Sequence, residues 1–435
     1  MKNGRTRSLS GFTLSSGREL VRPVAVVMNM FYTGLGIARS LGEQGIPVIG
    51  LSAHRIYGNH TRYAKVRSCP DSREDPNALL SFLNLLAGEI GSRSIIFPTR
   101  DDDVVFLDRF REELSPHFVP VIPSPGAVHR CLDKWETYLS AQKADIPAPR
   151  SWKLEQAEDL SCLLPDIRFP CVLKPLSSHY WRRGGNWERV GGRKAICVYS
   201  ASELLHEYER VTRADNRMLL QEIIPGNDDR LLIAACYMDR DSNVLASFTA
   251  RKLLQVPEGF GTGCIVQTVD EPNVVTLAVR LLREMRFNGI AEVEFKWDSS
   301  CAQYKLIEVN PRPWDQHRLG HSCCVDLVHW AYCDLAGIAL PQAQRKLTGC
   351  KWIAEDVFLL ACLRSLWKRD GKVREMSHLG RGKRIYGIWC ARDPFPFIAY
   401  AAGCFVSLLG IAFRRFPRVL CRRLLSKRIL EQKTV

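Results

Sequence analysis

The sequence lacks the short motifs that would place it in several common protein classes. None of its 16 cysteines forms a Cys-x-x-Cys pair, and the adjacent Cys323 and Cys324 are too close together for a usual zinc site. Residues 1–22 hold no apolar core of a secretory signal, and no long internal repeat is visible. We therefore expect a cytosolic protein with reduced, mostly buried thiols, and a flexible basic leader at residues 1–22.

Acidic residues become scarce only in the last fifth of the chain. Residues 345–435 contain 20 Lys or Arg and six Asp or Glu, whereas the whole chain has a net charge of +15, so the preceding residues are nearly neutral. A nucleic-acid-binding core would carry basic residues itself. We therefore expect no nucleic-acid partner, and we assign the attraction for an anionic partner to residues 346–435.

Residues 23–125 alternate apolar runs with amphipathic segments, which is typical of a doubly wound α/β domain. The alternation includes strands at 21–30 and 46–52 around a helix at 33–45, and it continues through 93–103 and 118–125. This order predicts a small parallel sheet with helices on its faces.

A glycine turn opens the helix predicted at 33–45. Gly34 and Gly36 match the first two glycines of the dinucleotide-binding pattern Gly-x-Gly-x-x-Gly, but Arg39 occupies the third position. The second strand also ends at Ser52 without an acidic residue for a ribose. We therefore do not predict a nicotinamide dinucleotide. The turn either packs the helix on its strand or holds an anionic group of a substrate.

Residues 126–345 mix many strands with few helices, which favours a second domain of the α+β class. Apolar or alternating patterns predict strands at 169–174, 195–199, 217–224, 231–237, 244–250, 289–297 and 303–310, and helices at 134–143, 201–212 and 273–286.

Two of these strands carry oxygen-bearing side chains on one face, because strand side chains alternate with period two. A short polar link predicts a hairpin, and a symmetric register about Cys301 places Glu294 opposite Glu308 and Glu292 opposite Asn310. Facing carboxylates destabilise a hairpin unless cations lie between them. The set Glu294, Glu308 and Asn310 suits Mg²⁺, and the alternative is a solvated polar face.

Two lysines lie where they could meet phosphate groups. Lys174 ends an apolar strand and enters a polar loop that contains four glycines, whose backbone N–H groups can bind phosphate. Lys134 follows Asp133 in the first turn of a predicted helix, where the helix dipole favours anions. An ordinary hairpin and a solvated lysine are the alternatives. The P-loop pattern Gly-x4-Gly-Lys-Ser/Thr is absent.

The segment Gln-Glu-Ile-Ile-Pro-Gly-Asn-Asp links two further strands. Backbone groups at Glu222 and Ile224 suit the edge of an adenine, and Asp228 or Asp229 suits ribose hydroxyls. The Pro-Gly-Asn-Asp stretch is also ordinary turn chemistry, so this signal is weak when taken alone.

Four segments in this order resemble the ATP-grasp superfamily: LDKWETYLSAQKADIPAP (132–149), CVLKP (171–175), LQEIIPG (220–226), and AEVEF (291–295) with LIEVNPRP (306–313). Within that superfamily the chain resembles predicted carboxylate-amine ligases related to the carbamoyl-phosphate synthase large subunit and to D-aspartate ligase. The resemblance covers about residues 23–345. It implies an ATP-grasp domain at 126–345 that follows a Rossmann-like pre-ATP-grasp domain at 23–125.

The resemblance also implies a role for each matching position. Lys134 and Lys174 would hold ATP phosphates. The adenine would be lined by Gln221, Glu222 and Ile224, and the ribose would meet Asp228 and then Asp229. Mg²⁺ (or Mn²⁺) would be bound by Glu294, Glu308 and Asn310, and Arg312 would meet an acyl phosphate or the incoming carboxylate. Two features depart from the pattern: Gln221 stands where an acidic residue is common, and the loop after Lys174 is long.

The implied reaction transfers a phosphoryl group from ATP to a small-molecule carboxylate, and an amine then displaces the phosphate to form an amide. Arg251 and Lys252 leave a strand before a glycine-rich stretch, so they are candidates for holding the carboxylate or the phosphoryl group, or simply surface charges. The alternatives are a non-catalytic, ATP-binding regulatory protein at a membrane and a phosphorylation of bicarbonate or carbamate as in carbamoyl-phosphate synthesis.

The region 346–435 reads as a basic helical extension. Asp393 and Pro394 form a helix-start signal, and residues 394–413 then carry no charge over just the length of a membrane span. A basic cluster follows, which suits an anionic inner leaflet. The ATP site must face the cytosol, and the basic cluster at the other end of the helix also prefers that side of a membrane. A helix that lies in the membrane interface therefore fits better than a simple span, and a helix that caps the core is the alternative. We expect a cytoplasmic protein at the inner face of the membrane; a homo-oligomer stays open.

Overall fold

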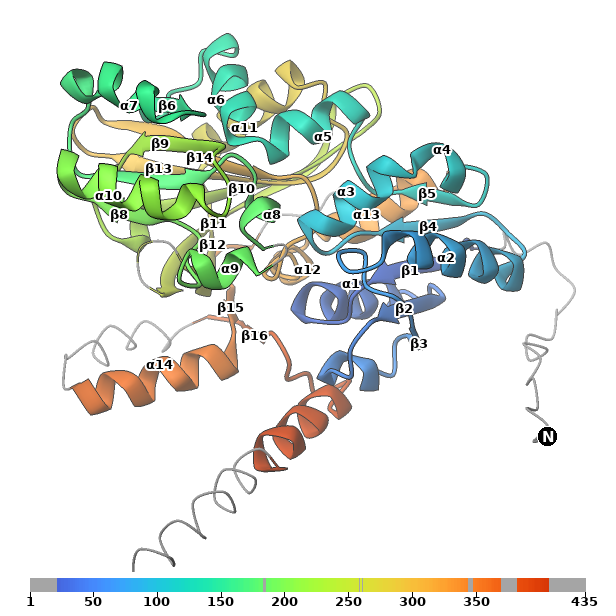
Figure 1. Cartoon of the computed structure of the whole chain (residues 1–435). Helices are drawn as coiled ribbons and strands as arrows, with labels where there is room; N and C mark the ends of the chain where they lie inside the picture. The colour runs from blue at the N-terminus through green and yellow to red at the C-terminus, as the bar shows by residue number, and fades with distance from the viewer. Residues whose placement is uncertain are drawn as a thin grey trace, which may run out of the picture.

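The computed structural model describes residues 22–182, 185–257, 259, 261–342, 347–368 and 382–406 (Figure 1). Three sheets organise this part of the chain, with five, seven and four strands. The fold is the mixed helix-and-strand type that the sequence predicts.

The five-stranded sheet is wholly parallel and has the order β3-β2-β1-β4-β5. The side chains of α1 pack on one face and those of α2 and α3 on the other, which is the doubly wound arrangement expected for this region. The elements are β1 (Ala25–Met28), α1 (Tyr32–Gly42), β2 (Val48–Ser52), η1 (Tyr57–His60), β3 (Lys65–Ser68), α2 (Pro76–Ile90), β4 (Ser94–Phe97), α3 (Asp101–Arg109), α4 (Arg111–Leu114) and β5 (Phe118–Pro120).

Gly34 and Gly36 lie inside α1 and not in a turn before it. A Cβ atom on Gly34 would lie 1.7 Å from the carbonyl oxygen of Asn29, and one on Gly36 would lie 2.7 Å from Nε2 of His317. Glycine is therefore required because backbone and side chain approach the helix too closely for any other residue. Of the two interpretations of these glycines, close packing is the one that the structure supports.

The seven-stranded sheet has the order β14-β13-β10-β11-β12-β15-β16 and is antiparallel except for its last pair. Helices α5, α6 and α11 cover one face, while α13 covers the other and packs against α1 of the five-stranded sheet. The elements are α5 (Pro125–Leu132), α6 (Lys134–Lys143), η3 (Asp228–Arg230), β10 (Leu231–Met238), β11 (Val244–Val256), β12 (Thr262–Val269), α11 (Pro272–Glu284), β13 (Gly289–Asp298), β14 (Gln303–Asn310), α12 (Leu319–Ser322), α13 (Leu327–Leu335), β15 (Lys351–Ile353) and β16 (Arg384–Tyr386).

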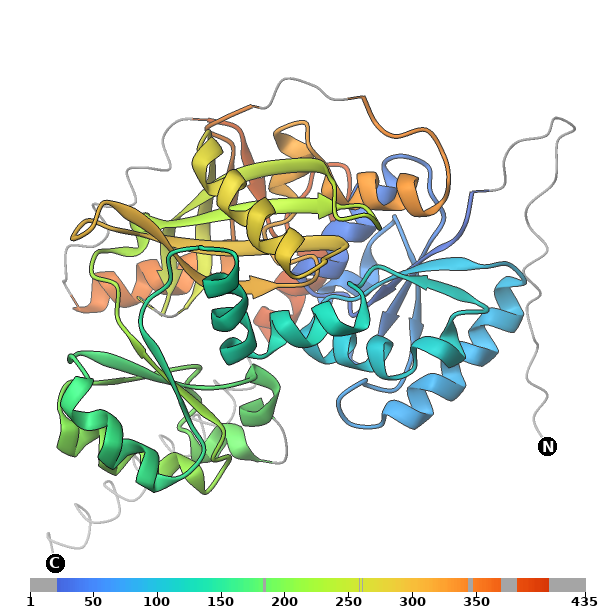
Figure 2. The same cartoon turned by 90° about the horizontal axis from the view of Figure 1, so that it is seen from above.

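The four-stranded antiparallel sheet forms a separate lobe beside the seven-stranded sheet (Figure 2). Its strand order is β6-β9-β7-β8. The elements are β6 (Ser151–Leu154), α7 (Ala157–Leu163), η2 (Leu164–Asp166), β7 (Cys171–Pro175), α8 (Ser178–Arg182), α9 (Asn186–Arg189), β8 (Ile196–Val198), α10 (Ala201–Thr212) and β9 (Met218–Glu222).

The last region is only partly helical, contrary to expectation, because β15 and β16 complete the edge of the seven-stranded sheet. Helix α14 (Glu355–Lys368) follows β15, and a further helix occupies residues 395–406. Among the described residues, no helix combines the length and the apolar character needed to cross a bilayer. Residues 407–413 of the predicted uncharged segment lie outside the described part of the chain.

The sequence suggested that Asp393 caps this last helix, but its side chain bonds elsewhere. Its carboxylate is fully buried and accepts hydrogen bonds from Nε of Arg39 at 2.9 Å, Oγ1 of Thr61 at 2.7 Å and the backbone N–H of Arg62 at 3.0 Å. Two charges buried together need such a complete set of partners. Arg39, at the third glycine position of the dinucleotide pattern, thus anchors the C-terminal helix to the five-stranded sheet.

Candidate active site

The hairpin β13–β14 has the register that the sequence predicts. Glu294 pairs with Glu308 and Glu292 with Asn310, while a bulge after Glu294 shifts the rest of the hairpin by one residue. Glu292 and Glu294 are only 4% and 7% exposed. Glu292 and Glu294 are therefore buried, whereas Glu308 and Asn310 are half-buried at a cavity, so this face is not an openly solvated polar surface.

The carboxylates on this face carry more negative charge than their one bonded lysine neutralises. Nζ of Lys252 donates to Oε1 of Glu294 at 2.6 Å, and Nδ2 of Asn310 donates to Glu292 at 3.0 Å and to Glu308 at 3.2 Å. Burial and the neighbouring Glu294 raise the pKa of Glu292 well above its ordinary value. Such crowding of buried carboxylates is relieved when a cation binds among them.

Burial alone would also raise the pKa of Glu308, but the ammonium groups of Lys134, Lys252 and Lys174 together hold that pKa below its ordinary value. The carboxylate of Glu308 is thus kept ionised at the centre of three lysines. It is the group that links the acidic face of the hairpin to Lys134 in α6 and to Lys174 in the four-stranded lobe.

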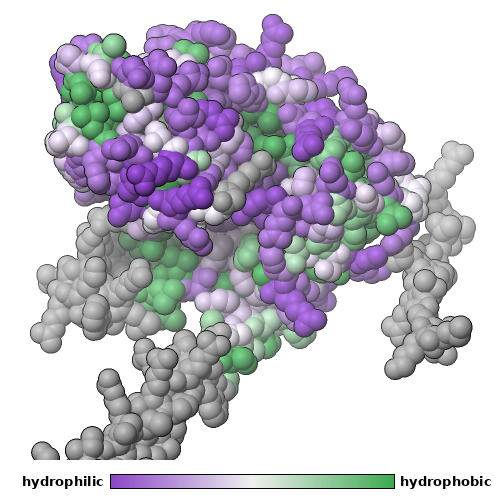
Figure 3. Space-filling model, in the orientation of Figure 1, coloured by the Kyte–Doolittle hydropathy of each residue, from purple (hydrophilic) through white to green (hydrophobic). Residues whose placement is uncertain are grey.

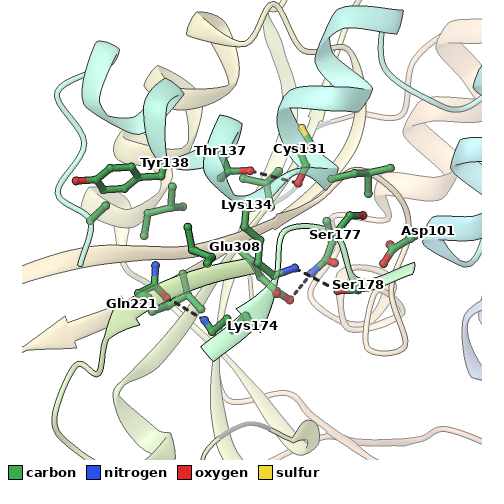
Figure 4. Close-up of a pocket in the computed structure, with 17 residues that line it drawn as sticks. Asp101, Cys131, Lys134, Thr137, Tyr138, Lys174, Ser177, Ser178, Gln221 and Glu308 are labelled. Carbon is green, nitrogen blue, oxygen red and sulfur yellow. Dashed lines mark hydrogen bonds between the residues drawn. The ribbon is translucent and has the colours of Figure 1, made fainter. Parts of the chain in front are cut away.

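Lys174 and Lys134 enter a pocket that also contains the carboxylate of Glu308 (Figure 4). Lys174 lies in β7 and donates to Oε1 of Gln221 at 2.9 Å, and Lys134 begins α6 and donates to Oγ of Ser178 at 3.2 Å. Burial and the charge of Lys134 lower the pKa of Lys174 to about 8, and burial lowers the pKa of Lys134. Two half-buried cations with lowered pKa values form a receptor for an anion.

Gln221, Glu222 and Ile224 lie along one wall of the main cavity, as expected for the link between the lobes. Gln221 is buried and also donates to Oγ of Ser151 at 2.9 Å, so its side chain holds Lys174 in place. Lys296, which the sequence did not single out, donates to the carbonyl oxygens of Ile224 at 2.9 Å and of Gly226 at 2.7 Å.

Asp228 and Asp229 do not line this cavity. The carboxylate of Asp228 accepts hydrogen bonds from the backbone N–H of Gln255 at 3.1 Å, from its side-chain amide at 2.8 Å, and from the N–H of Gly259 at 3.2 Å. Asp228 thereby ties η3 to the loop after β11. Asp229 lines another cavity, of about 260 Å³, so the ribose role of both residues stays a prediction that the geometry does not favour.

Arg251 lies in that other cavity with Asp229, and the structure does not bring it to the carboxylates. Its neighbour Lys252 points to the opposite face of β11, where it is buried against Glu294. Successive strand side chains point to opposite faces, so only one of the two could reach the site. The candidate beside the carboxylates is Lys252.

Arg312 leaves the end of β14 and reaches across to the five-stranded sheet. Its Nε donates to Oδ1 of Asp101 at 2.7 Å, and its Nη2 lies 3.5 Å from Oδ1 of Asn310. Asp101 is the first residue of α3, more than 200 positions away in the sequence. Sequence reasoning missed Asp101 because nothing local signals a partner at that separation.

Apart from Asp228, Asp229 and Arg251, these groups converge on one cavity of about 590 Å³, which lies between the three sheets. The charged residues that line it are Arg100, Asp101, Lys134, Lys174, Arg182, Lys194, Glu222, Lys252, Glu292, Glu294, Lys296, Glu308, Arg312 and Asp315. Glu292 was expected only as a residue that faces Asn310, although its period-two spacing from Glu294 is signal enough to predict it among the oxygen donors. The cavity brings lysines and carboxylates together, which suits a phosphate chain together with metal ions.

Solved structures of other proteins have a similar overall fold. A biotin carboxylase from Campylobacter jejuni superposes with a TM-score of 0.59 at 19% identity, covering 75% of this chain and 74% of that one. An N5-carboxyaminoimidazole ribonucleotide synthetase also gives 0.59, at 13% identity over 75% and 80% of the two chains. An L-amino acid ligase from Bacillus licheniformis gives 0.53, at 15% identity over 72% and 74%.

This chain has the ATP-grasp fold. No protein-family model matches its sequence. The resemblance stated from the four motifs is thereby confirmed at the level of the fold, and the hairpin, the two lysines and the inter-lobe link occupy one cavity of that fold.

The curated proteins that are similar in sequence match only part of this chain. D-aspartate ligase of Enterococcus faecium (strain Aus0004) is 24% identical over 266 residues, which cover 58% of this chain and 62% of that protein. The formate-dependent phosphoribosylglycinamide formyltransferase of Sulfurisphaera tokodaii is 24% identical over 214 residues, covering 47% and 50%. The chain thus matches less than two thirds of the length of either relative.

Proposed function

We propose that the protein is an ATP- and Mg²⁺-dependent carboxylate-amine ligase. The observation that carries the proposal is one cavity that holds both kinds of group. It is lined by Lys134 and Lys174, whose pKa values are lowered, and by the carboxylates of the hairpin. The relatives support it, since their names include D-aspartate ligase and L-amino acid ligase, and similar folds were solved with ADP and with MgADP.

The oxygen donors fit Mg²⁺ (or Mn²⁺) better than a metal that prefers thiolate or imidazole ligands, such as Zn²⁺. In the described part of the chain, no group of three or more His, Cys, Asp or Glu is arranged to hold a metal ion. Mg²⁺ commonly binds through one or two carboxylates, waters and substrate phosphates, so it does not need such a group. Glu294, Glu308 and Asn310, joined by Glu292, would hold it, and bound Mg²⁺ would neutralise phosphate charge.

The chain's own side chains would act mainly by position and charge. Lys134 and Lys174 would bind the phosphates, and Gln221, Glu222 and Ile224 would line the adenine. Lys252 and Arg312 would then hold the substrate carboxylate and, after phosphoryl transfer, the acyl phosphate. The amine attacks that acyl carbon, phosphate leaves, and no protein nucleophile is required.

The five-stranded sheet would serve as the pre-ATP-grasp domain, because its residue Asp101 reaches the site through Arg312. We propose that the reaction takes place in the cytoplasm, where ATP is available, at the inner face of the membrane. The bicarbonate alternative keeps some support, since biotin carboxylase is among the similar folds.

A substrate screen tests the ligase assignment. We expect ADP release from ATP only when Mg²⁺, a small carboxylate and an amine are all present, with mass spectrometry showing the condensed product. Amino acids are the first compounds to pair, both as acids and as amines. ADP release with bicarbonate alone would favour the alternative reaction, and tight ATP binding without release for any pair would favour a non-catalytic protein.

The neighbouring residues Lys252 and Arg251 provide a matched pair of variants. Lys252→Met is expected to reduce turnover by about 100-fold, and to destabilise the fold by about 3–5 kcal/mol because Glu294 is left buried without its partner. Arg251→Met, which changes the opposite face of the same strand, is expected to leave turnover within about twofold. ADP release and urea unfolding measure both effects. Loss of turnover in Arg251→Met alone would reverse the assignment.

A further inference from the structure

The C-terminal helix leaves the body of the protein with an apolar, uncharged surface. Residues 401–406 are all exposed, and the exposed fractions of Phe405 and Val406 are 63% and 66%. Ile398 and Phe395, about two and three turns before Phe405, are also more than half exposed. A helix of a water-soluble domain normally turns charged residues to solvent, and this one has none over the described turns.

Helix α14 has a similar surface. Leu359 and Leu360 are 59% and 61% exposed, in a stretch from Val357 to Cys362 that carries no charge. Figure 1 shows α14 and the helix at 395–406 projecting from the same side of the molecule, below β15 and β16. Figure 3 shows hydrophobic residues in the coloured portion of this lower part, and smaller hydrophobic patches among the hydrophilic residues of the upper lobes. The two helices thus form one exposed apolar side.

The chain that continues from each helix is basic. Residues 407–435 contain eight Lys or Arg and one Glu, and these are interspersed with leucine, isoleucine and phenylalanine. Residues 363–384, which follow the apolar part of α14, contain eight Lys or Arg and two acidic residues. Apolar side chains bordered by basic ones match a surface of anionic lipids, where the acyl boundary takes the former and the headgroups attract the latter.

The base of the C-terminal helix is fixed to the five-stranded sheet. Asp393 and Arg39 form a buried ion pair, and the rings of Tyr400 and Tyr57 lie edge to face with centroids 5.9 Å apart. Burial lowers the pKa of Arg39, and Asp393 partly restores it. This anchoring means that a surface bound by the helix would also set the orientation of the catalytic lobes.

We propose that α14 and the helix at 395–406 together dock the protein on an anionic lipid surface, as a peripheral protein that does not cross the bilayer. This inference deepens the location part of the proposed function and does not depend on the ligase chemistry. A second copy of the chain is the competing occupant of the same apolar side.

Vesicle flotation of the full chain tests the docking surface. We expect binding to vesicles of phosphatidylglycerol with phosphatidylcholine, at least tenfold weaker binding to pure phosphatidylcholine, and release by high salt. The double variants Leu359→Asp/Leu360→Asp and Ile398→Asp/Phe405→Asp should each reduce binding at least tenfold. Leu85→Asp is the control, because Leu85 is an exposed leucine on α2, away from both helices.

Several outcomes would overturn the proposal: no binding to anionic vesicles, equal loss of binding in Leu85→Asp, or retention of the protein on vesicles through alkaline carbonate washing. A dimer in ultracentrifugation that dissociates in the same double variants would show that a second copy covers this side. Nucleotide affinity measured without vesicles should be unchanged in the variants, so a failed ligase assignment and a failed docking surface give different results.

Discussion

Lys174→Met is expected to abolish nucleotide binding at micromolar concentrations and to lower ADP release by at least about 100-fold. Burial and the charge of Lys134 lower the pKa of Lys174 to about 8, so an anion added beside the two ammonium groups would be stabilised. Methionine keeps the volume of the side chain and removes its charge. Calorimetric titration with ADP measures the effect, and Lys143→Met, an exposed lysine at the other end of α6, is the control.

The same lysine gives nucleotide binding a pH dependence of predictable sign. Below pH 8 the empty site already holds the proton on Lys174, so affinity should be nearly constant there. Above pH 8 the phosphates must bind together with a proton, so affinity should fall by up to tenfold per pH unit and protons should be taken up on binding. Lys174→Met should lose most of this dependence. Proton release on binding by the wild type would contradict the placement of phosphate beside Lys174.

The sequence predicted the parts of the site that depend on local geometry. The Glu294–Glu308 pairing followed from the period of a strand and the length of one turn, and Lys174 followed from its place at the end of an apolar run. Both signals lie within about twenty residues of chain. This is the range over which a hairpin fixes which side chains face each other.

The sequence could not predict contacts between distant segments. Asp101 reaches Arg312 from another sheet. Asp393 looked like a helix cap because a proline follows it, and its partner Arg39, more than 350 residues away, could not be foreseen. The choice between Arg251 and Lys252 failed for a different reason. The surrounding stretch Thr-Ala-Arg-Lys-Leu-Leu-Gln has no strict alternation, so only the paired strands decide which face is which.

Short strands were missed because their pairing is what stabilises them. β15 and β16 have three residues each, and they stem from a region whose composition favours helices. They form because β12 presents an open edge and β16 then extends it in parallel. Backbone hydrogen bonds of that kind depend on an edge that exists only once the rest of the sheet has folded.

Glu308→Gln is expected to separate metal binding from phosphate binding. The wild type should bind ADP more tightly with Mg²⁺ than without it, because the ion would join Glu308 and its neighbours to the phosphates. In Glu308→Gln that gain should vanish and substrate-dependent ADP release should fall by at least about 100-fold. Binding of ADP without Mg²⁺ should persist, since Lys134 and Lys174 are unchanged. Calorimetry at a series of Mg²⁺ concentrations makes the comparison.

The variant also removes the negative charge that holds three lysines together, so its fold must be checked. The pKa of Glu308 is below its ordinary value, and the carboxylate therefore stabilises the fold at neutral pH and loses this effect as the pH falls through its pKa. Thermal unfolding at pH 7 and at pH 4 should show a smaller difference for Glu308→Gln than for the wild type. Glu284→Gln, at an exposed carboxylate on α11, should behave as the wild type does in every measurement. If Glu308→Gln is folded and keeps its response to Mg²⁺, the metal lies elsewhere in the cavity, and Glu292 with Glu294 becomes the pair to change next.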